Sequence, residues 1–303
     1  MIFPSPLKAG DTIAIVAPSG GITCRASFEE GIRILHEFGF KTKFPRDLWP
    51  GREYLADTDE NRSNELKTIW NDPEVDAVMA ARGGFGCLRI TAQLQSTTFF
   101  PQPKRFIGFS DITLLHSFLN EKHNLVTLHG PVVTSLSRLN QKSLLAFRSA
   151  LIERFDNWQC SFQPEILRDS HSCSGISAGG NLSTIISTLG TVCEQDWKNK
   201  IVILEDTGEP LYRIDRMLTQ LKLCGKLDTV SAILLGDFSH GLGLDRIETM
   251  RHHDAIWERM LDLTDENVTL WADVPVGHGA TNFTLPLGMK ITLDSMKGVV
   301  AHR

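Results

Sequence analysis

The chain has 303 residues, of which 42% are hydrophobic and 22% charged, and its formal net charge is −5. This composition is that of an ordinary globular protein, and the length suits two domains of roughly 100–200 residues each. No basic stripe occurs in the sequence, which argues against nucleic acid or an anionic membrane surface as a partner.

Cysteine usage and the N-terminal segment indicate a reducing compartment. The six cysteines are scattered and no two form a CxxC pair, so a zinc or redox site built on paired cysteines is not expected. The first residues lack the basic start and apolar segment of a secretory signal. No stretch reaches the ~20 apolar residues of a membrane span. We therefore expect a soluble cytoplasmic protein with no metal and no cofactor.

Apolar strands and periodic helices alternate through the first half of the chain. The pattern predicts strands at residues 12–19, 40–45, 75–81 and 105–109, and helices at residues 27–38, 57–71, 88–94 and 112–120. Such an alternation is typical of a parallel sheet covered by helices on both faces. In these sheets ligands bind at the carboxyl ends of the strands.

A polar stretch without clear periodicity, residues 151–174, separates the two halves, and we interpret it as a connector. It divides an N-terminal domain, residues 1–150, from a C-terminal domain, residues 175–303. Within the second domain the pattern predicts strands at residues 200–206, 232–238 and 290–295, and helices at residues 215–225 and 253–263. The sequence thus predicts an α/β protein with two domains.

The octet FIGFSDIT, residues 106–113, places Ser110 between an apolar strand and an apolar helix. A serine at such a corner can be lifted clear of the sheet to act as a nucleophile. Alternatively, Ser110 or Asp111 only caps the helix that follows, because both residue types accept hydrogen bonds from first-turn N–H groups. The octet alone leaves both interpretations open.

Glycines cluster in RGGFG, residues 82–86, directly after a predicted buried strand. A loop without Cβ atoms brings backbone N–H groups close to a phosphate or an oxyanion. The spacing is GGxG and not GxGxxG, which disfavours a dinucleotide site. A turn that needs only unusual dihedral angles is the alternative. Arg82 and Arg89 could hold a carboxylate or serve as structural ion-pair partners.

Two further candidates follow strands of the second domain. The strand at residues 200–206 ends in Glu205 and Asp206, and we favour Glu205 as an acid that orients a histidine, since neighbours in a strand face opposite ways. His278 lies between two glycines in PVGHG, which free the backbone to present its ring, although a packing role is equally open. His129, in LHGP, could line the same cleft or fill the core.

Ser110, Glu205 and His278 occur in that order, each beyond an apolar strand. Together they predict nucleophilic hydrolysis, with the nucleophile from the first domain and the base and its orienting acid from the second. The site would then lie in the groove between the domains, where ligand sites are common.

Five segments together resemble the LD-carboxypeptidases, serine peptidases that remove the terminal D-amino acid from murein tetrapeptides. The segments are GFSD, RGGFG, GGNL, ILEDTGEP followed by YRIDRML, and PVGHG. The resemblance runs from about residue 17 to about residue 288. It implies an N-terminal domain resembling class I glutamine amidotransferases and a smaller C-terminal swivelling β/α domain.

The resemblance also implies the site residues. The catalytic residues would be Ser110, His278 and Glu205 as a Ser-His-Glu triad that acts through an acyl-enzyme. The oxyanion hole would be formed by backbone N–H groups of the glycine loop, at Gly84 or at its neighbour 83, and of Asp111.

The reaction implied for this chain is removal of the terminal D-alanine from a murein tetrapeptide during peptidoglycan recycling. A sister branch of the family hydrolyses microcin-type peptidyl adenylates and confers immunity, which is the first alternative. Binding of murein peptides without catalysis is the second. The expected partner is the murein peptide, with neither nucleic acid nor membrane, and a homodimer is compatible with the family.

Overall fold

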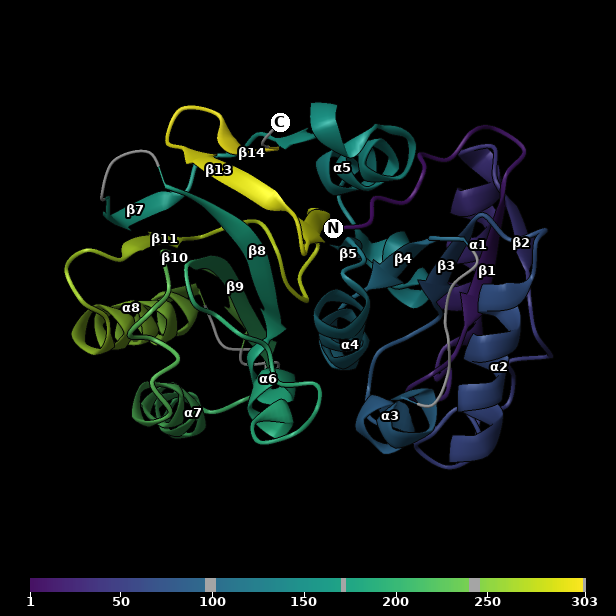
Figure 1. Cartoon of the computed structure of the whole chain (residues 1–303), viewed down its shortest axis with the longest axis horizontal. Coiled ribbons are helices and arrows are strands. Elements are labelled where there is room, and N and C mark those ends of the chain that lie inside the picture. The colour runs from purple at the N-terminus through teal and green to yellow at the C-terminus, as the bar shows by residue number, and fades with distance from the viewer. Residues whose placement is uncertain (96–101, 170–172, 240–245, 302–303) are drawn as a thin grey trace.

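The computed structural model describes residues 1–95, 102–169, 173–239 and 246–301 and contains two sheets. Figure 1 shows the N-terminal sheet with its helices on the right and the C-terminal sheet with its helices on the left. The molecule is therefore an α/β protein with one sheet in each half, and helix α4 (Thr113–His123) lies between the halves (Figure 1).

The N-terminal sheet has six strands in the order β12-β5-β4-β3-β1-β2. The five strands from the first half of the chain are parallel, whereas β12 comes from near the C-terminus and runs antiparallel to β5. The strands are β1 Thr12–Val16, β2 Lys41–Lys43, β3 Ala77–Ala80, β4 Arg105–Gly108, β5 Thr127–His129 and β12 Leu285–Leu287.

Both faces of this sheet are covered, because its strands are apolar on both sides. Ile13 and Ile15 of β1 belong to one hydrophobic core, and Ala14 and Val16 belong to another. Helices α1 and α5 pack on the first core, and α2, α3 and α4 pack on the second. Their bounds are α1 Arg25–Glu37, α2 Asp59–Asn71, α3 Cys87–Gln95 and α5 Gln141–Ile152. The predicted parallel sheet with helices on both faces is confirmed.

The C-terminal sheet is mixed and curled, with eight strands in the order β6-β14-β13-β8-β9-β10-β11-β7. Its four central strands β8 to β11 are parallel, and the outer pairings are antiparallel. The strands are β6 Gln159–Cys160, β7 Glu165–Arg168, β8 Ser174–Asn181, β9 Lys200–Thr207, β10 Ala232–Ser239, β11 Thr269–Ala272, β13 Lys290–Asp294 and β14 Gly298–Ala301. The helices are α6 Leu182–Thr188, α7 Leu211–Leu223 and α8 Arg246–Leu263.

Several elements differ from the sequence-based expectation. The stretch at 151–174 contains β6, β7 and the short 3-10 helix η3 (Phe155–Asn157), so it is more ordered than its polar composition suggests. Helix α7 begins at Leu211, directly after Pro210, and α8 begins at Arg246; both begin earlier than predicted. The 3-10 helices η1 (Ser110–Ile112) and η2 (Val133–Arg138) were also not foreseen.

Helix α4 is buried on more than one side because both halves of the molecule pack against it. Its first seven residues are all buried, and it contacts β8 and α6 of the C-terminal half. The Thr113 hydroxyl accepts a hydrogen bond from the Asn181 amide at 3.0 Å. A Cβ on Gly180 would lie 2.5 Å from that hydroxyl oxygen, so only glycine permits this approach. The contact fixes β8 beside the strand-to-helix corner that carries Ser110.

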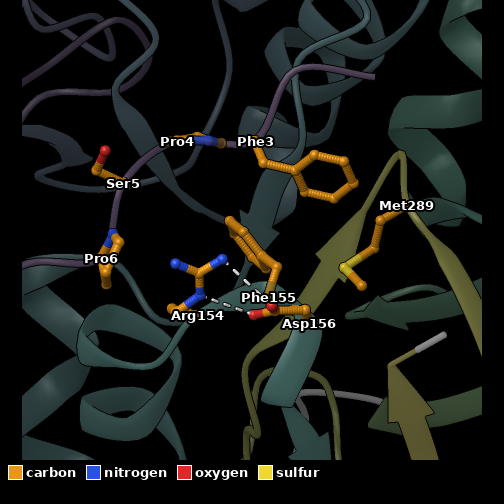
Figure 2. Close-up of a pocket in the computed structure, with 8 residues that line it drawn as sticks. All are labelled: Phe3, Pro4, Ser5, Pro6, Arg154, Phe155, Asp156 and Met289. Atoms are coloured by element: carbon orange, nitrogen blue, oxygen red, sulfur yellow. Dashed lines mark hydrogen bonds and ion pairs between the residues drawn. The ribbon is translucent and has the colours of Figure 1, made fainter. Parts of the chain in front are cut away.

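A pocket of about 410 Å³ lies where the N-terminal segment, η3 and the turn after β12 meet (Figure 2). Figure 2 shows the rings of Phe3 and Phe155 facing the Met289 side chain, and the two ring centroids are 6.1 Å apart. An ion pair of 3.1 Å joins Arg154 to Asp156 at its rim. None of the predicted catalytic residues lines this pocket.

Candidate active site

Ser110 occupies a strained corner between β4 and η1. Its φ is 64°, in the left-handed region that L-residues other than glycine, asparagine and aspartate rarely adopt. The corner is tight: a Cβ on Gly108 would lie 2.7 Å from the Ile112 side chain. Neither η1 nor α4 has a side-chain cap at its N-terminus. The capping alternative for Ser110 is therefore wrong, and backbone strain of this kind is typical of functional sites.

The glycine loop after β3 lies directly against Ser110. A Cβ on Gly83 would lie 3.0 Å from the Ser110 Oγ, closer than nearly all real Cβ contacts. The Gly83 carbonyl accepts from the Gly20 amide at 3.1 Å. In a trans peptide the N–H points opposite to the C=O, so the Gly84 N–H faces away from Gly20. Gly84 itself has a φ of 117°, which an L-side chain would strain.

Arg62 holds the far end of this loop, and sequence analysis did not single it out. The residue is 1% exposed, and its guanidinium donates to the Gly86 carbonyl at 3.0 Å and to the Pro18 carbonyl. Its charge is balanced by Asp59 at 2.6 Å. Arg89 pairs with the same carboxylate at 2.9 Å, and Arg82 donates to the Gly21 carbonyl. Both arginines proposed as anchors thus make structural contacts.

Asp111 has a buried carboxylate that does not cap its own helix. Its Oδ2 accepts from the Ser19 hydroxyl at 2.6 Å and from the Cys87 amide, the first residue of α3, at 2.9 Å. Burial raises the pKa of Asp111, although these hydrogen bonds act to lower it. The carboxylate joins the ends of β1, β3 and β4, which holds the corner at Ser110 and the glycine loop in one place.

Glu205 lies near the end of β9 and meets His278, which lies in the segment that follows β11 of the same sheet. The Nδ1 of His278 lies 2.8 Å from the Oε2 of Glu205, whose side chain is completely buried. Burial alone would lower the pKa of His278, but the charge and hydrogen bond of Glu205 raise it above its usual value. Burial would likewise raise the pKa of Glu205, but His278 lowers it. Both shifts favour the ionised pair.

The imidazole of His278 lies beside the residue that precedes Ser110. Its ring centroid is 4.6 Å from that of Phe109. With Nδ1 bonded to Glu205, Nε2 is the nitrogen left for the serine. No hydrogen bond joins the Ser110 Oγ to His278 among the described residues. The structure therefore brings the three predicted residues to one place, with the acid and the imidazole in contact.

Asp206, the neighbour of Glu205, has a different task. It is 3% exposed, and its Oδ1 accepts from the Asn181 Nδ2 at 3.1 Å, while its Oδ2 accepts from the Ser183 amide at 2.8 Å. Asn181 in turn caps α6 by accepting from the Thr184 amide at 3.0 Å. Through Asn181, the segment GGNL therefore anchors α6 to the strand that carries Glu205. The sequence pattern did not predict this role.

The described residues contain no group of three side chains that could hold a metal ion. Within the same residues no helix has both the length and the apolar character needed to cross a membrane. All six cysteines are free; three are buried, one is half-buried and two are exposed. The described residues at the site supply a hydroxyl, an imidazole–carboxylate pair and backbone amides, a set typical of a serine-hydrolase type of centre.

The two halves of the chain match the two domains of one family. Residues 13–130 match the LD-carboxypeptidase N-terminal domain, and residues 174–293 match the LD-carboxypeptidase C-terminal domain. The murein tetrapeptide carboxypeptidase of Pseudomonas aeruginosa is 31% identical over 297 residues, which cover 93% of this chain and 92% of that protein. The chain belongs to the LD-carboxypeptidase family of serine-type peptidases.

Two solved structures show how widely this fold is shared. The muramoyltetrapeptide carboxypeptidase from Oxalobacter formigenes superposes with a TM-score of 0.81 at 26% identity, over 95% of this chain and 97% of that one. The microcin C7 self-immunity protein MccF, bound to glutamyl sulfamoyl guanosine, gives 0.84 at 23% identity over 100% and 99%. The MccF protein of Escherichia coli is 25% identical over 328 residues, 97% of this chain and 93% of that protein.

Proposed function

We propose that this chain is a serine LD-carboxypeptidase that removes the terminal D-alanine from murein tetrapeptides. The observation that carries the proposal is the 2.8 Å contact between His278 and the buried Glu205, next to the strained corner of Ser110. The names of the relatives in Pseudomonas aeruginosa and Oxalobacter formigenes support the murein substrate.

In the proposed acylation step the Ser110 Oγ attacks the carbonyl carbon of the scissile amide. The Nε2 of His278 takes the hydroxyl proton and then gives it to the nitrogen of the leaving D-alanine as the C–N bond breaks. Glu205 keeps the Nδ1 of His278 protonated, which leaves Nε2 free to accept, and it stabilises the imidazolium. Water then attacks the ester by the same route and releases the shortened peptide.

The developing oxyanion would be held by the backbone amides of Gly84 and Asp111. Asp111 is the second residue of η1, where unbonded first-turn N–H groups create positive potential. The Gly84 amide faces away from Gly20, and its neighbour Gly83 contacts the Ser110 side chain. Donors fixed in this way stabilise the transition state without reorganisation.

We also propose the division into an N-terminal domain, residues 1–150, resembling class I glutamine amidotransferases, a connector, residues 151–174, and a smaller C-terminal swivelling domain, residues 175–303. Pairing of β12 with β5 and of β6 and β7 with the C-terminal sheet shows where chain segments cross between the halves. The catalytic groups would then approach each other from both domains.

The test is release of D-alanine from a purified murein tetrapeptide, measured by chromatography. Wild-type protein should release it, and Ser110→Ala should not, while circular dichroism shows both folded. A folded wild-type protein that leaves the tetrapeptide intact would count against the proposal. A serine-directed fluorophosphonate probe that labels wild type and not Ser110→Ala would separate an active serine from a wrong substrate.

Hydrolysis of a peptidyl adenylate is the second candidate, favoured by the likeness to MccF over the whole chain. Turnover of a tetrapeptide and of an aminoacyl sulfamoyl or peptidyl adenylate substrate should be compared in the same preparation. A higher kcat/KM for the adenylate would replace the first proposal. Binding of either compound without turnover and without probe labelling would instead favour a binding protein.

A further inference from the structure

Several buried polar atoms without a hydrogen-bond partner lie behind the Glu205–His278 pair. The second carboxylate oxygen of Glu205, Oε1, is one of them, and both ring nitrogens of His129 are others. The Asn181 side chain is a further polar neighbour of the Glu205 carboxylate. Both side chains are 0% exposed. A buried carboxylate oxygen and a buried imidazole are costly to leave unbonded, so each such group in a native structure needs an explanation.

His129 is buried in the N-terminal sheet, close to the corner that carries Ser110. His129 ends β5 and pairs in register with Gly108 of β4, two residues before Ser110. The ring of Phe109 lies 6.2 Å from the His129 ring and 4.6 Å from the His278 ring. His129 thus comes from the N-terminal sheet, and it interacts electrostatically with Glu205 of the C-terminal sheet.

The charges around His129 come from few residues. Glu205 and His278 act on it electrostatically, and burial lowers the pKa of His129, which keeps its ring neutral. His116 of α4 is the third titratable neighbour, with a ring centroid 6.3 Å away, and its Nε2 bonds to the Gly108 carbonyl at 2.8 Å. A neutral imidazole next to a buried carboxylate acts as a hydrogen-bond donor toward it.

Thr284 adds a third unpartnered group to the same region. Its buried Oγ1 makes no hydrogen bond, and it packs against Gly130, the residue after His129. The next residue, Leu285, pairs with His129 across the sheet. A buried water needs two to four polar partners, and a carboxylate oxygen, an imidazole and a hydroxyl provide that set.

We propose that His129 is a positioning residue of the triad, which holds the Oε1 of Glu205 through one bridging water while His278 holds Oε2. This inference rests on the proposed function, because it assigns Glu205 the task of orienting His278. It gives the acid a fixed partner on each oxygen, one from each sheet.

Loss of the His129 contact should change the apparent pKa of the Glu205–His278 pair in one direction only. A neutral donor on Oε1 stabilises the ionised carboxylate, so its removal raises the proton affinity of the Glu205–His278 pair, whichever member holds the proton. The apparent pKa of the pair should then rise. Because only neutral His278 can accept the serine proton, activity at a given pH near neutrality should fall.

The experiment compares His129→Leu, His129→Gln and the matched control His116→Leu. Wild type and variants carry ¹³C-labelled histidine, and the ring signal of His278 is titrated by NMR without any substrate. We expect the midpoint in His129→Leu to rise by roughly 1–2 pH units, the size of one lost hydrogen bond to a charged group. His129→Gln, which keeps a donor, should stay near wild type. His116→Leu should lose thermal stability but keep the midpoint.

Kinetics give a second readout. With murein tetrapeptide, His129→Leu should lower kcat about tenfold at constant KM, because the missing contact acts on the reaction and not on substrate binding. If the NMR midpoint moves but no variant or wild type cleaves the peptide, the proposed function fails and the positioning role stands. An unchanged midpoint in folded His129→Leu overturns the role. If His129→Leu does not fold, a crystal structure of wild type or of His129→Gln decides. The positioning role is overturned if the Oε1 of Glu205 bonds there to a group other than the proposed water.

Discussion

The two sheets contribute to the site by different physical means. The N-terminal sheet contributes backbone geometry: a serine with a φ of 64° and a glycine loop that leaves no room for a Cβ beside it. The C-terminal sheet contributes buried charge, since Glu205 is 0% exposed and bonded to His278. Activity should therefore be sensitive to added atoms in the first half, and to pH and loss of charge in the second half.

Removal of the charge of Glu205 should have the largest effect. Glu205→Gln preserves the shape but no longer fixes the tautomer of His278, so kcat should fall about 10⁴-fold, as expected for the orienting acid of a triad. Steady-state hydrolysis of the tetrapeptide measures this.

Asp206→Asn is the matched control, because the same charge is lost one residue away. Asp206 bonds to Asn181 and Ser183 and not to the imidazole. We expect lower stability and a kcat within about tenfold of wild type, since no contact to a reacting group is lost. Equal losses in both variants would show that Glu205 has only a structural role.

An added methyl group should affect the N-terminal half more than the C-terminal half. In Gly83→Ala the new Cβ lies 3.0 Å from the Ser110 Oγ, so the nucleophile must move, and kcat should fall about 10²-fold. In Gly279→Ala, beside His278, the nearest atom is 3.5 Å away, which is ordinary contact. That variant should keep kcat within a few-fold. The opposite order would contradict the division of tasks between the sheets.

The pH dependence of kcat/KM should be set by the Glu205–His278 pair of the C-terminal half alone. Because the pKa of His278 is raised by Glu205, the base becomes neutral only above its usual value of about 6.5. The kcat/KM should therefore rise about tenfold per pH unit on the acid side and level off above that value. Gly83→Ala should lower the plateau and leave the inflection in place. An inflection at or below pH 6.5 would be at odds with the raised pKa.

The smallest expected effect concerns the strain at Ser110. With φ at 64°, glycine is better tolerated than alanine, so Ser110→Gly should have a free energy of unfolding about 1 kcal/mol higher than Ser110→Ala. Ser149 lies in α5, where the order should reverse by about the same amount because alanine is the better helix former. Denaturant unfolding of the four variants measures both differences.

Much of the architecture was predictable from local pattern. Most strands and helices of the first half follow from apolar runs and helical periods, as β3 and α4 show, but α5 was not predicted. Strand β8 was not foreseen, because its sequence SGISAGGN has no strand preference, and two of its glycines have positive φ. Its pairing with β9 and its contact with α4 stabilise it, and both arise only in the tertiary structure.

The site, too, was predictable only where its residues are contiguous in the sequence. Ser110 could be suggested from its octet because strand, corner and helix are contiguous in sequence. The contact of Glu205 with His278 joins residues 73 apart, and it depends on β9 meeting the segment that follows β11 of the same sheet. The roles of Arg62 and Asp111 were hidden as well, because each bonds to loops that the sequence does not place together.

The return of β12 to the N-terminal sheet has a consequence for biosynthesis. The outer edge of β5 is completed by residues 285–287, which are synthesised after the five other strands of this sheet. Until then the half that carries the serine has an open edge, and the imidazole that would activate it has only just been translated. A nascent chain that has not yet reached β12 therefore leaves a strand edge exposed, which proteases or chaperones can recognise.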